Sequence, residues 1–103
     1  MNKIFEGLKI VELASVLAGP SVGMFFAELG AKVIKIENKK TGGDITRKWK
    51  LPSEKKDNNY SAYFSSINYR KKHLFLNLKK EDEYEQLINI IQDADIVLSL
   101  IHI

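Results

Sequence analysis

The sequence contains no cysteine, and this absence excludes several kinds of chemistry at once. A chain without thiols can form no disulfide, no thiolate metal site and no covalent intermediate on a cysteine. His73 has no second metal-binding side chain near it in the sequence, so we expect no metal. The composition fits a reducing compartment, and we predict a cytoplasmic protein.

The sequence also lacks any long hydrophobic run. A membrane-spanning helix needs about 18 or more consecutive apolar residues, and no segment approaches that length. The amino terminus is interrupted by Lys3, Glu6 and Lys9, which is unlike the apolar core of a secretory signal peptide. We therefore expect neither a membrane partner nor export.

Neither sign of charge dominates, because 16 basic residues are set against 13 acidic ones, for a net charge of +3. The basic residues gather in the polar segment 38–59 and at 70–72. No recognisable nucleic-acid-binding module accompanies them, so we interpret them as a solvent-exposed loop and expect no nucleic-acid partner. Their lysines would also suit a ligand that carries several phosphates.

Two short apolar runs joined by one amphipathic segment are the most informative feature of the chain. The pattern predicts a buried strand over 9–13 and a second strand over 32–37. Between them Pro20 suits the first turn of a helix, and Gly30 ends it. The predicted inner face of this helix consists of Val22, Phe25, Phe26 and Leu29. Strand, helix and strand in that order form a βαβ unit.

The rest of the chain repeats the alternation after a long interruption. Residues 38–59 follow neither the helical nor the strand period and predict a long loop, of a kind that is usually functional or mobile. We predict a short helix over 60–67, a strand over 74–78, a helix over 81–92 and a fourth strand from 96 to 98. This order predicts an α/β fold with Rossmann-like βαβ units and a mainly parallel sheet.

Several strings of residues, taken in order, resemble one protein family. The sequence is similar to the N-terminal portion of the family III CoA-transferases, which include formyl-CoA and carnitine CoA-transferases, with α-methylacyl-CoA racemase in the same superfamily. The similarity runs in register across residues 7–97, and no single string would establish it. The strings are 7–13 (GLKIVEL), 16–20 (VLAGP), 27–37 (AELGAKVIKIE), 43–47 (GDITR) with Trp49, 62–64 (AYF), Asn68 with 70–72 (RKK), 76–79 (LNLK) and 94–97 (ADIV).

The resemblance implies that the chain binds CoA, in acyl-CoA, and belongs to an enzyme that moves CoA between carboxylic acids. In the family an aspartate carboxylate attacks the acyl-CoA thioester, and an aspartyl-CoA thioester then passes CoA to an acceptor carboxylic acid. Two segments would hold CoA. Val16, Leu17 and Ala18 would line the pantetheine and thioester end, and Leu76, Asn77, Leu78 and Lys79 would lie against the adenosine end.

Two departures from the family pattern concern binding and catalysis. Asn38 stands where the family usually has an arginine near the nucleotide, so Lys39 or Lys40 would have to replace that contact. The catalytic aspartate of the family lies downstream of the matching region, so we assign no catalytic residue and predict that this chain alone is inactive. Residues 1–97 would be the incomplete N-terminal, CoA-binding part of a larger domain, and the complete protein would be an interlocked homodimer.

Residues 98–103 depart from the family in another way. After position 97 the family typically continues with an acidic residue, Asn and Phe, whereas this chain reads LSLIHI. That string resembles the translation of a transposon-end adapter used in preparing sequencing libraries. We therefore predict a non-native tail over 98–103 and assign no role to His102.

Other interpretations of the same residues stay open. Residues 16–18 and 76–78 would be apolar in any α/β sheet and also fit plain core packing. Glu37 at the end of a βαβ unit fits an NAD- or FAD-binding Rossmann domain, although residues 19–23 do not form its glycine fingerprint. Residues 42–44 fit an ordinary turn as well as a binding loop. An acyl-CoA racemase and a non-enzymatic α/β binding module are the remaining alternatives.

Overall fold

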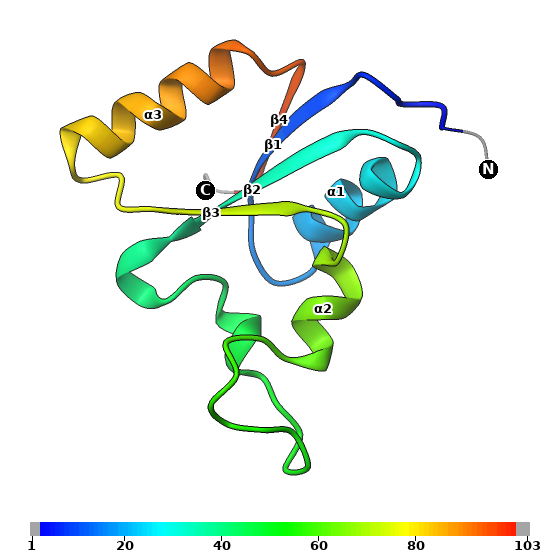
Figure 1. The fold of residues 1–103 in the computed structure, drawn as a ribbon, viewed down its shortest axis with the longest axis vertical. Helices are drawn as coiled ribbons and strands as arrows, with labels where there is room; N and C mark the ends of the chain where they lie inside the picture. Colours follow the sequence, from blue (N-terminus) through cyan, green and yellow to red (C-terminus); the bar gives the residue numbers. More distant parts are fainter. Residues whose placement is uncertain (1–2, 101–103) are drawn as a thin grey trace.

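Four parallel strands form the sheet that organises this protein (Figure 1). The computed structural model describes residues 3–100, so the last three residues of the predicted tail, His102 among them, lie outside the described part. The strand order is β3-β2-β1-β4, and each neighbouring pair is parallel. The strands are β1 (Lys9–Leu13), β2 (Lys32–Asn38), β3 (Lys72–Leu76) and β4 (Ile96–Ser99).

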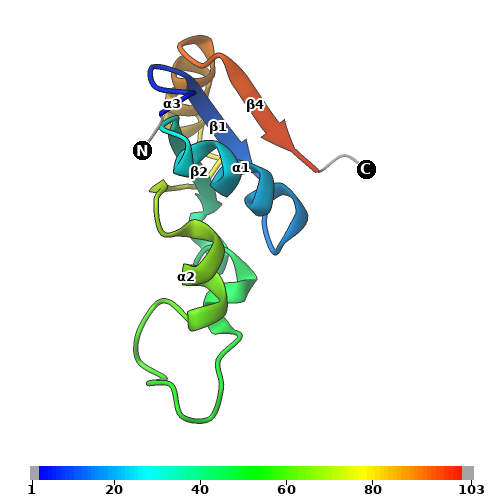
Figure 2. The same cartoon turned by 90° about the vertical axis from the view of Figure 1, so that its right-hand side faces the viewer.

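Helices cover both faces of the sheet (Figures 1 and 2). Helices α1 (Ala18–Glu28) and α2 (Ala62–Asn68) lie on one face, and α3 (Glu81–Gln92) lies on the other. The predicted long loop between β2 and α2 contains two short 3-10 helices, η1 (Lys39–Thr41) and η2 (Ile45–Lys48). No helix within residues 3–100 is long and apolar enough to cross a membrane. The predicted α/β fold with a parallel sheet is confirmed.

Each face of the sheet has its own apolar core, because successive residues of a strand point to opposite sides. On one face Ile10 and Val33 pack with Ala27 of α1. On the other face Val11 packs near Leu87 of α3. The strand residues of the core on the α3 face are Val11, Leu13, Ile34, Ile36, Leu74 and Leu76. The α1 face instead carries charged residues toward the carboxyl ends of the strands.

Strand β3 begins and ends two residues earlier than the predicted strand over 74–78. Asn77 provides the reason, because its side-chain Oδ1 accepts a hydrogen bond from the Lys79 backbone N–H at 3.1 Å. The Lys80 N–H also donates to the Asn77 carbonyl oxygen at 3.0 Å. An asparagine that bonds the backbone two residues ahead forms a turn, so Leu78 lies beyond the strand.

The inner face of α1 also differs from the predicted one. Val22 and Phe25 are 44% and 56% exposed. The buried positions of the helix are Gly19, Pro20, Gly23, Met24 and Ala27. A Cβ atom on Gly23 would collide with Oε1 of Glu12 on β1. Small residues therefore face the sheet because α1 packs closely over a charged strand side chain, and this reverses the usual apolar periodicity.

The substitution Gly23→Ala tests this close approach. Alanine favours a helix over glycine by about 1 kcal/mol. The added methyl group meets the buried Glu12 carboxylate, so we expect the free energy of unfolding to fall by about 1–3 kcal/mol. Urea unfolding measures the change, with Ser21→Ala on the exposed side of α1 as the control. A Gly23→Ala protein as stable as the parent would contradict the packing described.

Candidate functional site

A cavity of about 880 Å³ lies at the carboxyl ends of β1, β2 and β3. Its walls come from the ends of these strands and from the segments that follow them. Ligands of parallel α/β sheets bind outside the carboxyl ends of the strands, so this is the candidate site. The lining residues are Leu13, Ala14, Ser15, Lys35, Ile36, Glu37, Asn38, Lys40, Thr41, Gly43, Asp44, Ile45, Leu76, Asn77, Leu78 and Lys79.

Both segments that the sequence assigned to a ligand reach this edge of the sheet. The predicted residues that line the cavity are Asn38, Leu76, Asn77, Leu78 and Lys79. Val16, Leu17 and Ala18 do not line it, but they directly follow Ser15, which does. Leu17 is 50% exposed, so core packing does not account for it. Leu76 is buried in the core of the α3 face, as the packing interpretation expects.

Two lysines on the cavity wall carry no ion pair with any residue in the range 3–100. These are Lys40, which follows β2, and Lys79, which follows β3. Their neighbours Lys39 and Lys80 instead lie 3.9 and 4.0 Å from the Glu83 carboxylate. The wall therefore presents two ammonium groups that an anionic ligand could pair.

Four side chains of alternating charge form a row on the α1 face, which we name the buried charge chain: Lys71, Glu12, Lys35 and Asp44. Lys71 Nζ lies 2.7 Å from Glu12 Oε1. Lys35 Nζ lies 2.9 Å from Glu12 Oε2 and 3.0 Å from Asp44 Oδ2. All four side chains are fully buried in these pairs. Since an unpaired charge in the interior is costly, each member depends on its neighbours.

Lys35 and Lys71 of the buried charge chain also donate to backbone carbonyl groups around the β1–α1 turn. Lys35 Nζ donates to the Ala14 carbonyl at 2.7 Å. Lys71 Nζ donates to the Pro20 carbonyl at 2.9 Å and to Asn68 Oδ1 at 2.7 Å. Burial lowers the pKa of Lys71, and the Glu12 carboxylate opposes that change. The ammonium groups thus tie the strand side and the helix side of the turn to the sheet.

Val16, inside the same turn, adopts a left-handed backbone with φ of 70°. This conformation is rare for a β-branched residue. Its N–H points between the two carboxylate oxygens of Asp44, at 3.3 and 3.4 Å. Burial alone would raise the pKa of Asp44, but hydrogen bonds from Thr46 and Lys35 outweigh it and hold the pKa below its ordinary value. Asp44 is therefore an ionised acceptor beneath the turn.

Glu37 at the end of β2 is occupied by a second set of polar contacts. Arg47 donates to both of its oxygens, from Nε at 2.8 Å and from Nη2 at 2.6 Å. His73 Nδ1 lies 3.0 Å from Oε2, and the Asp44 N–H donates to Oε1 at 2.8 Å. Burial opposes ionisation, yet these bonds lower the pKa of Glu37 from 4.5 to about 2. The carboxylate is not free to bind a ribose.

The prediction that the basic residues at 38–59 and 70–72 are exposed is wrong for Arg47 and Lys71, which are both buried. The Arg47 guanidinium stacks 4.0 Å from the centre of the Phe64 ring. It also donates to the Asn59 carbonyl at 2.6 Å. A planar guanidinium can pair with a carboxylate and stack on a ring at once, so Arg47 anchors the loop to β2 and α2.

Glu12 and Lys35 were not predicted as site residues, although the sequence carries a signal for them. Both stand within apolar strand runs, where a charge must find a partner if the strand is buried. Glu37 lies two residues after Lys35 and therefore on the same face of β2. The register also places Glu12 beside Lys35.

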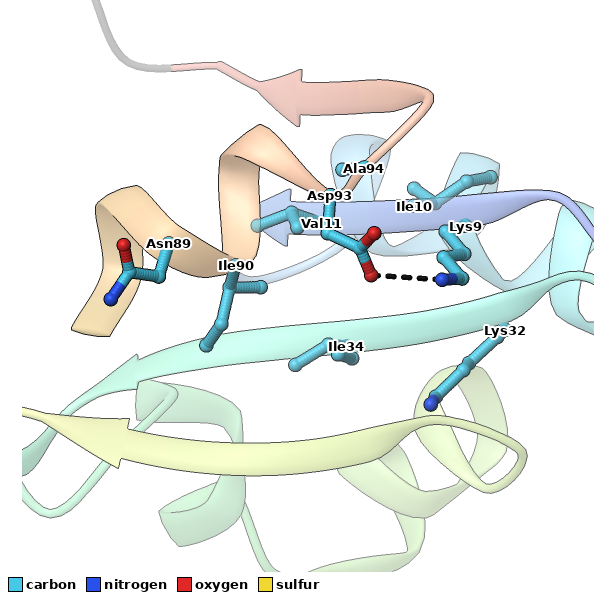
Figure 3. Close-up of a pocket in the computed structure, with 9 residues that line it drawn as sticks. All are labelled: Lys9, Ile10, Val11, Lys32, Ile34, Asn89, Ile90, Asp93 and Ala94. Atoms are coloured by element: carbon cyan, nitrogen blue, oxygen red, sulfur yellow. Dashed lines mark hydrogen bonds and ion pairs between the residues drawn. The ribbon is translucent and has the colours of Figure 1, made fainter.

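A smaller cavity of about 240 Å³ lies between α3 and the sheet (Figure 3). It includes Lys9 and Lys32, the first residues of β1 and β2, so it lies toward the amino ends of these strands. Its one drawn polar contact joins Lys9 Nζ to Asp93 Oδ2 at 2.8 Å. No predicted site residue lines it. Among residues 3–100, no three acidic or histidine side chains come together as a metal-binding group.

Comparison with known proteins identifies relatives along nearly the whole chain. The family model described as CoA-transferase family III matches residues 5–101. A succinate–glutarate CoA-transferase of Agrobacterium fabrum is 38% identical over 96 residues, which cover 90% of this chain and 24% of the relative. A formyl-CoA:oxalate CoA-transferase of Streptomyces avermitilis is 35% identical over 98 residues, covering 95% of this chain and 23% of the relative.

Solved structures give the same result. The crystal structure of a CAIB/BAIF family protein from Brucella suis aligns with a TM-score of 0.79 at 36% identity. The alignment covers 94% of this chain and 25% of that protein. The chain therefore spans about a quarter of the length of the relatives that it matches.

Gly42 and Gly43 offer a matched test of how closely the loop packs against Glu37. Both have positive φ, of 81° and 101°. A Cβ on Gly43 would lie 2.6 Å from Glu37 Oε1 and 2.8 Å from a Phe75 ring carbon, whereas a Cβ on Gly42 would meet nothing. We expect Gly42→Ala to cost about 1 kcal/mol of stability from backbone strain, and Gly43→Ala about 2 kcal/mol more. Urea unfolding distinguishes the two variants, and an equal loss of stability in both would contradict the close packing of Gly43 against Glu37.

The lowered pKa of Glu37 predicts how stability depends on pH. Its pKa is about 2 in the folded protein and 4.5 ordinarily, so its contribution is complete above pH 4.5 and is lost as the pH falls toward 2. The shift corresponds to about 3 kcal/mol. Urea unfolding from pH 5 to pH 2 should show a flatter pH profile for Glu37→Gln than for the parent. Glu85→Gln on exposed α3 is the control and should keep the parental slope.

Proposed function

The chain belongs to CoA-transferase family III, and from that membership we propose that it is the N-terminal, CoA-binding part of an enzyme that transfers CoA between carboxylic acids. One observation carries the proposal. The segment 76–79 at the end of β3, which the family resemblance assigns to the adenosine end of CoA, lines the 880 Å³ cavity, and so does Ser15, which directly precedes the residues 16–18 assigned to the other end. Ligand sites of this volume commonly lie at the carboxyl ends of parallel strands.

We propose that the adenosine and phosphate end of CoA lies beside Leu76–Lys79. Lys79 and Lys40 line this part of the wall without ion pairs to the described residues, and phosphate groups attract such ammonium groups. Lys40 rather than Lys39 is favoured as the replacement for the family arginine, because Lys39 lies near Glu83 and does not line the cavity. Asn38 is exposed and lines the same wall.

The pantetheine and thioester end would then run past Ser15 toward Val16, Leu17 and Ala18. Leu17 and Ala18 are exposed at the start of α1, and a pantetheine arm needs apolar contact and close backbone approach more than charge. This placement assigns all eight predicted residues to one ligand path. The acyl group would lie beyond the turn, outside the part of the protein described here.

The proposed reaction requires an aspartate carboxylate, which the family resemblance places downstream of the residues matched here. An aspartate would attack the thioester carbonyl, the C–S bond would break and the CoA thiolate would leave, forming a mixed anhydride. The thiolate would then attack the aspartyl carbonyl, release the original acid and form an aspartyl-CoA thioester. An acceptor carboxylate reverses these steps. Asp44 cannot serve, because its oxygens are held by Lys35 and Thr46, and we propose that the chain alone is inactive.

The NAD- or FAD-binding alternative is disfavoured by the state of Glu37. A dinucleotide-binding fold uses the acidic residue at this position to bind ribose hydroxyl groups. Here both carboxylate oxygens are bonded to Arg47, and the side chain is buried. We further propose, from the family resemblance, that the complete enzyme is a cytoplasmic, interlocked homodimer.

A ligand panel tests the proposed function in the complete gene product that contains this chain. We expect CoA at 100 times its dissociation constant to stabilise the protein by about 2.7 kcal/mol and raise its melting temperature. NAD and sulfate at equal concentration should give no comparable rise. A melting temperature that responds to NAD but not to CoA would reject the proposal.

Variants of the wall lysines refine the same experiment. Lys79→Ala and Lys40→Ala should each weaken CoA binding by about threefold to tenfold, because each removes one cation from the phosphate end. Lys32→Ala, at the opposite end of the sheet, is the matched control and should bind CoA like the parent. Equal affinity in all three variants would exclude the lysines from the site.

A further inference from the structure

We propose that Asp44 is a positioning residue, which holds the β1–α1 turn in the one conformation that presents residues 15–18 to the thioester end of CoA. The inference rests on the proposed function and adds to it a residue whose carboxylate is bonded to the turn. It depends on the hydrogen bonds between the buried charge chain and the backbone that joins β1 to α1.

The turn is in a conformation that it would not hold unaided. Val16 has a φ of 70°, and a left-handed conformation of a residue other than glycine costs about 1–3 kcal/mol. Such a conformation persists only when the surrounding structure enforces it. The enforcing contact is the pair of Asp44 carboxylate oxygens, which accept the Val16 N–H at 3.3 and 3.4 Å.

Asp44 can enforce this conformation because its own position is fixed from several directions. Thr46 donates to Oδ1 from its backbone N–H at 3.0 Å and from its hydroxyl at 2.8 Å. Lys35 Nζ lies 3.0 Å from Oδ2, and the Asp44 N–H is bound to Glu37 at 2.8 Å. The carboxylate is therefore held between β2 and the start of η2.

The same buried charge chain forms hydrogen bonds with the backbone at two further points. Lys35 binds the carbonyl of Ala14 on the strand side, and Lys71 binds the carbonyl of Pro20 on the helix side. Glu12 joins the two lysines. The backbone from 14 to 20 is thus held before, within and after the turn by side chains from β2, the loop and the segment before β3.

These three contacts leave other residues of the turn accessible to a ligand. Ser15 lines the cavity, and Leu17 and Ala18 are exposed. A wall that is already in its binding conformation spares the ligand the entropy cost of ordering it. The buried charge chain therefore acts on affinity for the pantetheine arm through the conformation of the turn.

The substitution Asp44→Asn tests the inference in the complete gene product. It replaces Oδ2 by an NH₂ group that faces two other donors, the Lys35 ammonium and the Val16 N–H, so Val16 keeps only its longer bond, to Oδ1. Isothermal titration compares CoA with adenosine 3′,5′-bisphosphate, which lacks the pantetheine arm. We expect CoA to bind about tenfold more weakly and the bisphosphate to bind within about twofold of the parent.

Two further variants keep the test decisive. Val16→Gly takes up positive φ without strain, so adding Asp44→Asn to it should weaken CoA binding by less than about threefold. If Asp44→Asn does not fold, Thr46→Val takes its place in the test. This substitution removes one donor to Asp44 at nearly constant volume, and it should weaken CoA binding by about threefold. Asp93→Asn, an exposed aspartate near the amino ends of the strands, is the control and should bind both ligands normally.

The outcomes separate the inference from the function on which it rests. A parent protein that does not bind CoA would reject the proposed function. A parent that binds CoA, with Asp44→Asn binding it equally well, would overturn the inference alone. An equal loss of CoA and bisphosphate affinity would also overturn it, since a general disturbance of the site affects both ends of the ligand.

Discussion

The structure depends on the pairing of charges inside the sheet. Glu12 and Lys35 lie side by side on β1 and β2, and each is completely buried. Removing one partner of such a pair leaves the other charged in the interior, at a cost of about 3–5 kcal/mol. Lys71 and Asp44 extend the pair at both ends, so the segment before β3 and the long loop must return to the sheet. One electrostatic requirement thus fixes segments that are distant in the sequence.

The same requirement explains the packing of α1. A helix that covers a buried carboxylate can place neither a bulky apolar residue nor an unsatisfied polar one above it, and Gly23 satisfies this condition. Val22 and Phe25 consequently turn outward. The second polar cluster, around Glu37 and Arg47, closes the loop over α2. Because Arg47 binds both carboxylate oxygens of Glu37 at the end of β2, this cavity lacks the free carboxylate with which a dinucleotide-binding fold binds a ribose.

Much of the fold could be predicted from the sequence because each element carries its own periodicity. Strands β1 and β2 have dense β-branched runs, and α3 begins with three acidic residues at 81–83. The wrong details arose where distant residues decide the outcome. Lys71 and the Pro20 carbonyl are 51 positions apart, and no local pattern reveals such a contact. The cavity edge was predictable from strand direction, whereas the grip of Asp44 on Val16 was not, because a left-handed valine leaves no mark in the sequence.

Lys35 stands on the wall of the cavity proposed for CoA. Glu12, Ala14 and Asp44 each have an oxygen within 3.0 Å of its Nζ atom. A lysine has three N–H donors, so Lys35 has none left for a molecule that enters the cavity. Recognition of an anion there consequently falls to Lys40 and Lys79, the two lysines of the wall that are not committed to the fold.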